Sequence, residues 1–240
     1  MERAIALSSN NSIGCVVLRN TNHWIRGGNY GWQAVERKRI GICFTNTKPN
    51  MPAWGGTEPK LGNNPMIIAI PRKKGDLVLD MALSQYSYGK IKEFARKQML
   101  LPYPGGLDAN GNLTRDPISI LENERSLPIG LWKGAGLSLI LDIFASILSD
   151  GKSTHQIGQL EAEHALSQVF IAIDTIQFGD SESLDIKVDA IIEDLKSSRT
   201  YENATVRYAG ENTYILRKKN LKSGIPLDQE TWSKIHKYLL

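Results

Sequence analysis

The sequence predicts an α/β fold in which a mixed sheet is surrounded by helices. Apolar runs of strand length alternate along the chain with segments whose apolar residues recur at helical spacing. The connections between these runs have both hairpin and crossover lengths, which favours a sheet of mixed strand direction. The chain has 240 residues, 41% of them hydrophobic, which is enough for one large core.

Five apolar runs are predicted to be strands: 14–18, 40–45, 66–70, 77–81 and 168–174. Arg72-Lys73-Lys74-Gly75 lies between the third and fourth runs, so we expect a hairpin there. Cys15 and Cys43 lie within two of the runs and outside any CxxC pattern. We therefore expect two buried free thiols, which is typical of a protein in a reducing compartment.

Helices are predicted for the opening residues, 30–38, 88–98, 136–148, a segment beginning at Ser181, and two segments that close the chain. The run 136–148 is apolar on all sides, which predicts a central buried helix. The last helix is expected to be capped near Asp228 and to bury Trp232, Ile235 and Leu239. The segments 46–65 and 100–128 are predicted to be loops, and loops of that length are usually functional or disordered.

Composition and motifs exclude several classes of function. The net charge is +4, and the densest basic run, Arg217-Lys218-Lys219, has no interleaved aromatic residues, so no nucleic-acid partner is expected. No signal-peptide core opens the chain and 136–148 is too short to span a bilayer, so we expect a cytoplasmic protein without a membrane partner. No histidine has another His or Cys at ligand spacing, so no metal site is expected.

Two nucleotide-binding patterns are incomplete. Gly151-Lys152-Ser153 resembles the end of a P-loop, but it lacks the earlier glycine and follows a helix instead of a strand. Gly134-Ala135-Gly136 begins a GxGxxG pattern that ends in Leu139, and no acidic residue follows at the ribose-binding distance. The sequence therefore predicts no P-loop and no Rossmann site.

Four segments concentrate polar and small residues: 19–31, 61–65, 77–82 and 128–136. In the first, His23 precedes Gly27 and Gly28 at the start of a helix, where backbone can approach an anion. The alternative is that His23 only bonds a neighbouring loop. In the third, Asp80 interrupts an apolar run, and a buried carboxylate there must be paired, for example with a histidine whose tautomer it fixes. Lys133 lies among glycines at a helix start, which suits a phosphate or carboxylate.

In order, these segments contain Asn22-His23, Gly62-Asn63-Asn64-Pro65, Leu79-Asp80-Met81 and Lys133-Gly134. Over the whole chain this series resembles the malate/L-lactate dehydrogenase family, whose fold binds NAD(P) without a Rossmann fingerprint. The resemblance implies a homodimer that reduces a small 2-oxo acid, here a 2-oxo sugar acid, to the 2-hydroxy acid with NAD or NADP as cofactor. It implies one unit over 1–240, in which about 40–150 binds the cofactor and the remainder binds the substrate and the partner subunit. The cofactor contacts that it implies are Asp76, Leu77, Val78, Leu79, Asp80, Met81, Ala82, Trp132, Lys133, Gly210, Glu211 and Asn212.

The family's proton donor is a histidine in a Ser-His-Gly motif of an N-terminal segment, and no histidine of this chain lies between Ser and Gly. We therefore expect a truncated chain with strongly reduced activity, because a positioned acid contributes about 10²–10⁴-fold to the rate. His23 and Asp80 remain as catalytic candidates. The alternative is an inactive homologue that keeps a dimer surface and weak cofactor binding.

Overall fold

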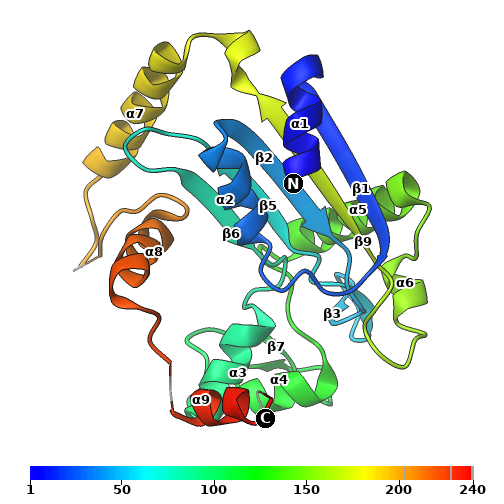
Figure 1. Cartoon of the computed structure of the whole chain (residues 1–240). Coiled ribbons are helices and arrows are strands. Elements are labelled where there is room, and N and C mark those ends of the chain that lie inside the picture. The colour runs from blue at the N-terminus through cyan, green and yellow to red at the C-terminus, as the bar shows by residue number, and fades with distance from the viewer. Residues whose placement is uncertain (203, 228, 239–240) are drawn as a thin grey trace.

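The computed structural model describes residues 1–202, 204–227 and 229–238, and its centre is a five-stranded sheet (Figure 1). The strand order is β1-β9-β2-β5-β6. The bounds are β1 (Ile13–Thr21), β9 (Leu166–Asp174), β2 (Arg39–Thr45), β5 (Met66–Ile70) and β6 (Leu77–Met81). The predicted α/β class is confirmed, and each of the five predicted strands is present.

The strand directions differ from the prediction, because every neighbouring pair in this sheet is antiparallel. The connection from β1 through α2 (Gly28–Glu36) to β2 is a crossover, and these two strands point the same way. However, β9 lies between them and pairs with both. A strand from far along the chain thus replaces the expected parallel pair by two antiparallel ones, and no local pattern specifies that insertion.

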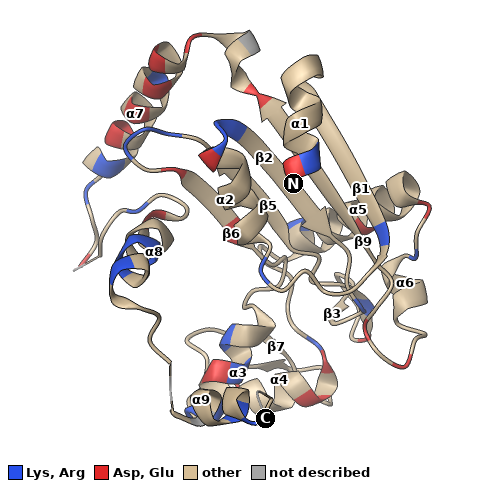
Figure 2. Ribbon diagram, viewed as in Figure 1, with Lys and Arg blue, Asp and Glu red and all other residues tan. Residues whose placement is uncertain are grey.

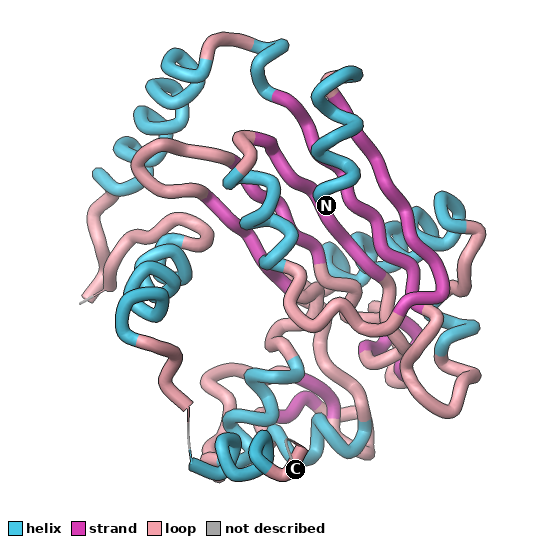
Figure 3. Tube along the Cα trace, in the orientation of Figure 1, coloured by secondary structure: helices cyan, strands magenta, loops and turns pink. Residues whose placement is uncertain are grey.

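Helices cover both faces of the sheet (Figures 1 and 3). On one face α1 (Glu2–Asn11) contacts β1 and β9, and α2 contacts β2, β5 and β6. On the other face α5 (Trp132–Ser149) contacts β9, β1 and β2. Two apolar cores result, one around Trp32 and Phe170 beneath α2 and one around Phe44 and Leu141 beneath α5.

The burial predictions for α5 and for Cys15 are wrong. The α5 helix was expected to be buried on all sides, but it buries only one face, and Ile147 on the outer face is 73% exposed. Among the described residues, α5 is long and apolar enough to cross a membrane by length and composition alone, yet it packs on the sheet through the buried face. Cys15 is exposed because β1 is an edge strand, whereas Cys43 is buried in the central β2.

The segments predicted to be loops contain short elements. Within 46–65, β3 (Met51–Pro52) pairs with β4 (Pro59–Leu61). Within 100–128, β7 (Gly106–Leu107) pairs with β8 (Leu113–Thr114), and α4 (Pro117–Asn123) follows. The α4 helix packs with α3 (Tyr88–Arg96) around Ile91, Leu101 and Ile120. The α6 helix (Thr154–Ile157) and a 3-10 turn (Thr175–Phe178) flank β9.

Three helices end the described chain: α7 (Ser181–Ser197), α8 (Glu211–Ser223) and α9 (Gln229–His236). Figure 2 shows that α7 is rich in acidic residues and lies beside the basic β5–β6 turn. The cap of α7 is Asp180, whose carboxylate accepts from the backbone N–H groups of residues 182 and 183. Trp232 and Ile235 are exposed, contrary to the prediction, and the predictions for Asp228 and Leu239 lie outside the described residues.

Candidate functional site

The outer edge of β6 is the first part of the candidate site. In the five-stranded sheet β6 pairs only with β5, and the Val78 N–H donates to the Ala209 carbonyl at 3.1 Å. The next residue, Gly210, has φ +86, and a Cβ there would lie 2.8 Å from both the nitrogen and the oxygen of Val78. The close approach and the left-handed backbone both require glycine. The predicted segments 76–82 and 210–212 are thus in contact.

The first turn of α8 therefore begins beside β6, with Gly210 as its N-cap. The N–H groups at a helix start lack intrahelical partners and carry the positive end of the helix dipole, so they suit a phosphate group. Glu211 pairs with Lys196, and the second carboxylate oxygen of Glu211 is buried without a hydrogen-bond partner. The Gly210 backbone leaves no room for a Cβ, and the first turn of α8 follows it directly. Together they form a surface on which a dinucleotide could lie.

The start of α5 lies at the other end of β6. The Ile129 N–H donates to the Leu83 carbonyl at 2.8 Å, and Ser84 forms a β-bridge with Pro128. Trp132 and Lys133 follow and are both exposed. From residue 76 to residue 82 a strand extends for about 20 Å, which is comparable with the length of an extended dinucleotide. Residues 210–212 thus meet one end of β6, and the turn that precedes Trp132 and Lys133 contacts the chain just beyond the other end.

Asp80 is less buried than the sequence predicts, because β6 is an edge strand. Its side chain is 28% exposed, and Oδ2 lies 3.5 Å from Nε of Arg26. The carboxylate lies against the start of α2, where a Cβ on Gly28 would be 2.5 Å from the same oxygen. The expected pairing therefore exists, but the described partner is a guanidinium and not an imidazole.

His23 lines a separate polar cavity of about 440 Å³. The Ile25 N–H donates to His23 Nδ1 at 2.9 Å, so the neutral ring carries its proton on Nε2. An Nε2–H group can donate to the oxygen of a bound ligand. Both alternatives for His23 that the sequence left open are thus present in the geometry, since the ring bonds its own loop and also faces a cavity.

Other polar groups complete the wall of this cavity. Lys48 pairs with Glu124, and the Tyr88 hydroxyl donates to the Asn50 carbonyl at 3.0 Å. Burial raises the pKa of Tyr88 to about 12, so this phenol stays protonated near neutral pH. The Asn63 carbonyl accepts from the Leu83 N–H at 2.8 Å, which joins the cavity to the end of β6.

Asn64 belongs to the predicted segment 61–65, but it has a structural role. It is fully buried, and its Oδ1 accepts from the Thr47 N–H at 3.0 Å. Its Nδ2 donates to the backbone oxygen and to the hydroxyl of Ser138 in α5, at 2.9 and 3.1 Å. Asn64 thus ties the loop to α5 and does not face the cavity.

Several cavity residues were missed by sequence reasoning, namely Lys48, Tyr88, Lys92, Glu124 and Glu163. They come from four separate segments and form no spaced motif, so no sequence signal could have identified them. Among the described residues, no group of three or more His, Cys, Asp and Glu side chains is arranged to hold a metal ion.

Residues 1–236 match the malate/L-lactate dehydrogenase family, and the chain belongs to that family. The named relatives are dehydrogenases and reductases, so the chain is an oxidoreductase.

Individual relatives show which members of the family the chain is similar to. The chain is 44% identical over 237 residues to 2,3-diketo-L-gulonate reductases of Citrobacter koseri and Escherichia coli K12, covering 98% of this chain and 71% of each relative. Sulfolactate dehydrogenase from Methanocaldococcus jannaschii is 33% identical, with a TM-score of 0.81 over 97% of this chain and 67% of that one. Malate dehydrogenase from Entamoeba histolytica is 27% identical, with a TM-score of 0.91 over 98% and 70% of the two chains.

Proposed function

We propose that the chain binds NADH or NADPH along the outer edge of β6 and reduces a 2-oxo sugar acid such as 2,3-diketo-L-gulonate. One observation carries the proposal: the turn at Gly210 meets the outer edge of β6 near one end, and the segment before α5 meets the chain just beyond the other end. The identity to reductases named for that substrate supports the substrate class. The predicted cofactor-binding region of about 40–150 would extend to residues 210–212.

The residues present fit this cofactor. The Gly210 backbone and the first turn of α8 would hold the phosphates, and Lys133, beyond the other end of β6, would contact the opposite end of the cofactor. The reduced nicotinamide supplies a hydride. Reduction of a ketone leaves an alkoxide that needs a proton, and His23, which lines the cavity that adjoins the end of β6, would supply it from Nε2–H. Asp80 would hold the Arg26 side chain near the start of α2.

Two measurements on the purified chain test the proposal. NADH fluorescence should change on binding, and NADH should be oxidised when 2,3-diketo-L-gulonate is added. The His23→Ala variant should bind NADH as the parent does but turn over roughly 10²–10⁴-fold more slowly. No binding of NADH or NADPH would contradict the proposal, whereas binding without any turnover would support an inactive homologue.

We also propose that the chain forms a homodimer. Support comes from the exposed apolar side of α5, which includes Ile140, Phe144 and Ile147, because contiguous apolar surface usually marks an interaction site. Light scattering should give twice the monomer mass of 26.7 kDa. A monomer at micromolar concentration would contradict the proposal. The expected cytoplasmic location stays a prediction.

A further inference from the structure

Ile25 has a backbone conformation that its own side chain disfavours. Its φ is +66, and among the described residues it is the one β-branched residue with a positive φ. A left-handed backbone is costly for such a residue because the Cβ crowds the following carbonyl oxygen. Ile25 is also 88% exposed, so packing of its own side chain does not impose this conformation. The neighbouring chain must therefore hold it in place.

The residues on both sides of Ile25 are anchored to the core. Trp24 is buried, and its ring centroid lies 5.8 Å from that of Tyr30. Gly27 packs so closely that a Cβ there would lie 2.3 Å from Cδ1 of Ile67. Because both ends of this short segment are fixed, the φ of Ile25 and the direction of the peptide group before it cannot vary independently.

The anchored turn directs the Ile25 N–H group at the imidazole of His23. This N–H donates to Nδ1 at 2.9 Å, so Nδ1 acts as an acceptor and the neutral ring carries its proton on Nε2. With the same anchors, a right-handed or extended φ at Ile25 would turn the peptide group away from the ring. The strained backbone and the fixed tautomer of His23 thus belong to the same turn.

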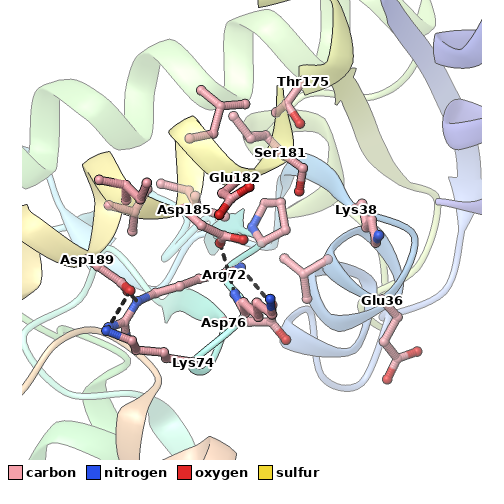
Figure 4. Close-up of a pocket in the computed structure, with 18 residues that line it drawn as sticks. Glu36, Lys38, Arg72, Lys74, Asp76, Thr175, Ser181, Glu182, Asp185 and Asp189 are labelled. Atoms are coloured by element: carbon pink, nitrogen blue, oxygen red, sulfur yellow. Dashed lines mark hydrogen bonds and ion pairs between the residues drawn. The ribbon is translucent and has the colours of Figure 1, made fainter. Parts of the chain in front are cut away.

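The proton on Nε2 of His23 remains available to a ligand. No hydrogen bond to Nε2 occurs within the described part of the chain, and the ring lines the cavity of about 440 Å³. A larger cavity of about 740 Å³ beside α7 differs, because its cations Arg72 and Lys74 are both paired with Asp189 (Figure 4). His23 therefore offers an unpaired donor at a cavity wall.

We propose that Ile25 is a positioning residue, whose left-handed backbone holds the His23 ring in the Nε2–H tautomer as a ready hydrogen-bond donor. This inference deepens the proposed function, because it assumes that a substrate oxygen lies at Nε2 of His23. A ring with its proton on Nδ1 would instead present a lone pair to that oxygen, and the two would repel each other. In this role Ile25 acts through His23 and not on the substrate itself.

The first measurement is NMR of the whole chain with isotope-labelled imidazole nitrogens at about pH 8.5, well above the ordinary pKa of histidine. His23 should show only the Nε2–H tautomer, and a scalar coupling should join its Nδ1 to the Ile25 amide nitrogen. His164 is an internal reference for the opposite tautomer, because its Nδ1 lies 2.9 Å from the Ala162 carbonyl oxygen and must donate to it. The His23→Ala variant identifies the His23 signals.

Two substitutions separate the backbone of Ile25 from its side chain. Ile25→Pro removes the N–H group and cannot adopt a positive φ, so the His23 signals should become a mixture of both tautomers. Ile25→Asn keeps the N–H group and tolerates the left-handed backbone, so it should keep the parent tautomer.

The same two variants should differ in the kcat for 2,3-diketo-L-gulonate. In Ile25→Pro it should fall about tenfold, which is less than the 10²–10⁴-fold typical of a lost proton donor, and in Ile25→Asn it should stay within about twofold of the parent. The Kd of NADH should be unchanged in both variants, because Ile25 affects only the orientation of the His23 ring.

A single Nε2–H tautomer in folded Ile25→Pro would overturn the inference, and so would a mixture of tautomers in the parent. An equal loss of turnover in Ile25→Asn would also overturn it, because the exposed side chain would then be responsible. If circular dichroism shows that Ile25→Pro does not fold, the tautomer and the scalar coupling in the parent still decide the question. The NMR measurement needs no turnover, so a parent with the single tautomer but no NADH oxidation would contradict the proposed function and leave the hold of Ile25 on the ring in place.

Discussion

The Asp80 carboxylate lies 3.5 Å from the Arg26 guanidinium, across 54 residues of sequence. This pair fixes the loop after β1 against β6, because the Asp80 carboxylate lies directly beside Gly28 at the start of α2. The pair thus joins two of the four segments that the sequence marks as functional. Experiments can separate the effect of this pair on the free energy of unfolding from its effect on cofactor binding.

A double-mutant cycle on Arg26→Ala and Asp80→Asn should give a coupling free energy of unfolding below about 1 kcal/mol, because the Arg26 side chain is 59% exposed and the two groups are 3.5 Å apart. Binding should respond more strongly, and the Kd of NADH should rise in Asp80→Asn if Asp80 borders the cofactor. Urea denaturation and NADH titration measure the two effects. A strong coupling in unfolding with an unchanged Kd would assign Asp80 a structural role only.

Replacing Gly210 by alanine should weaken both folding and cofactor binding. The new Cβ would be 2.8 Å from the Val78 backbone, so the α8 turn has to move away from β6. Gly55→Ala is the matched control, since Gly55 has φ +85 but a Cβ added to it would meet nothing within 4 Å. Both variants should lose about 1 kcal/mol through backbone strain.

Only Gly210→Ala should lose further stability and raise the Kd of NADH. Thermal unfolding and NADH titration of the two purified variants give the comparison. Equal losses in both variants would mean that the close approach of Gly210 to Val78 is unimportant.

Asn64→Ala should destabilise the protein by about 2–4 kcal/mol, because it removes several hydrogen bonds of a fully buried amide and leaves their partners unsatisfied. Asn11→Ala, at an exposed position of α1, should change the free energy of unfolding by less than about 0.5 kcal/mol. The two values come from urea denaturation curves. A loss of cofactor binding by folded Asn64→Ala at unchanged stability would instead place Asn64 in the site.

Asp76→Asn should stabilise the cofactor-free chain at neutral pH. The pKa of Asp76 is raised in the folded state, chiefly by burial, so the folded chain binds the proton more tightly than the unfolded chain does. Stability from this group is therefore present at low pH and is lost as pH rises through the folded pKa. Thermal unfolding should show a Tm advantage of the variant that grows from acidic to neutral pH. An advantage that shrinks with rising pH would contradict the assigned direction.

Local patterns predicted much of the fold because their physical causes are local. Apolar runs of strand length predicted the five strands, and apolar residues at helical spacing predicted most of the helices, including α2, α3 and α5. The degree of burial was not predictable in the same way. The apolar run of α5 shows that this helix has a buried face, but only the packed structure shows that Ile147 is outside.

Sequence by itself determined the class of this protein, because four short segments in order identify the family. The tertiary structure alone decided how those segments meet. The insertion of β9 between β1 and β2, and the contact of Gly210 with Val78, join residues that are more than a hundred positions apart. Such contacts depend on packing of the whole chain, and neither propensity nor spacing encodes them.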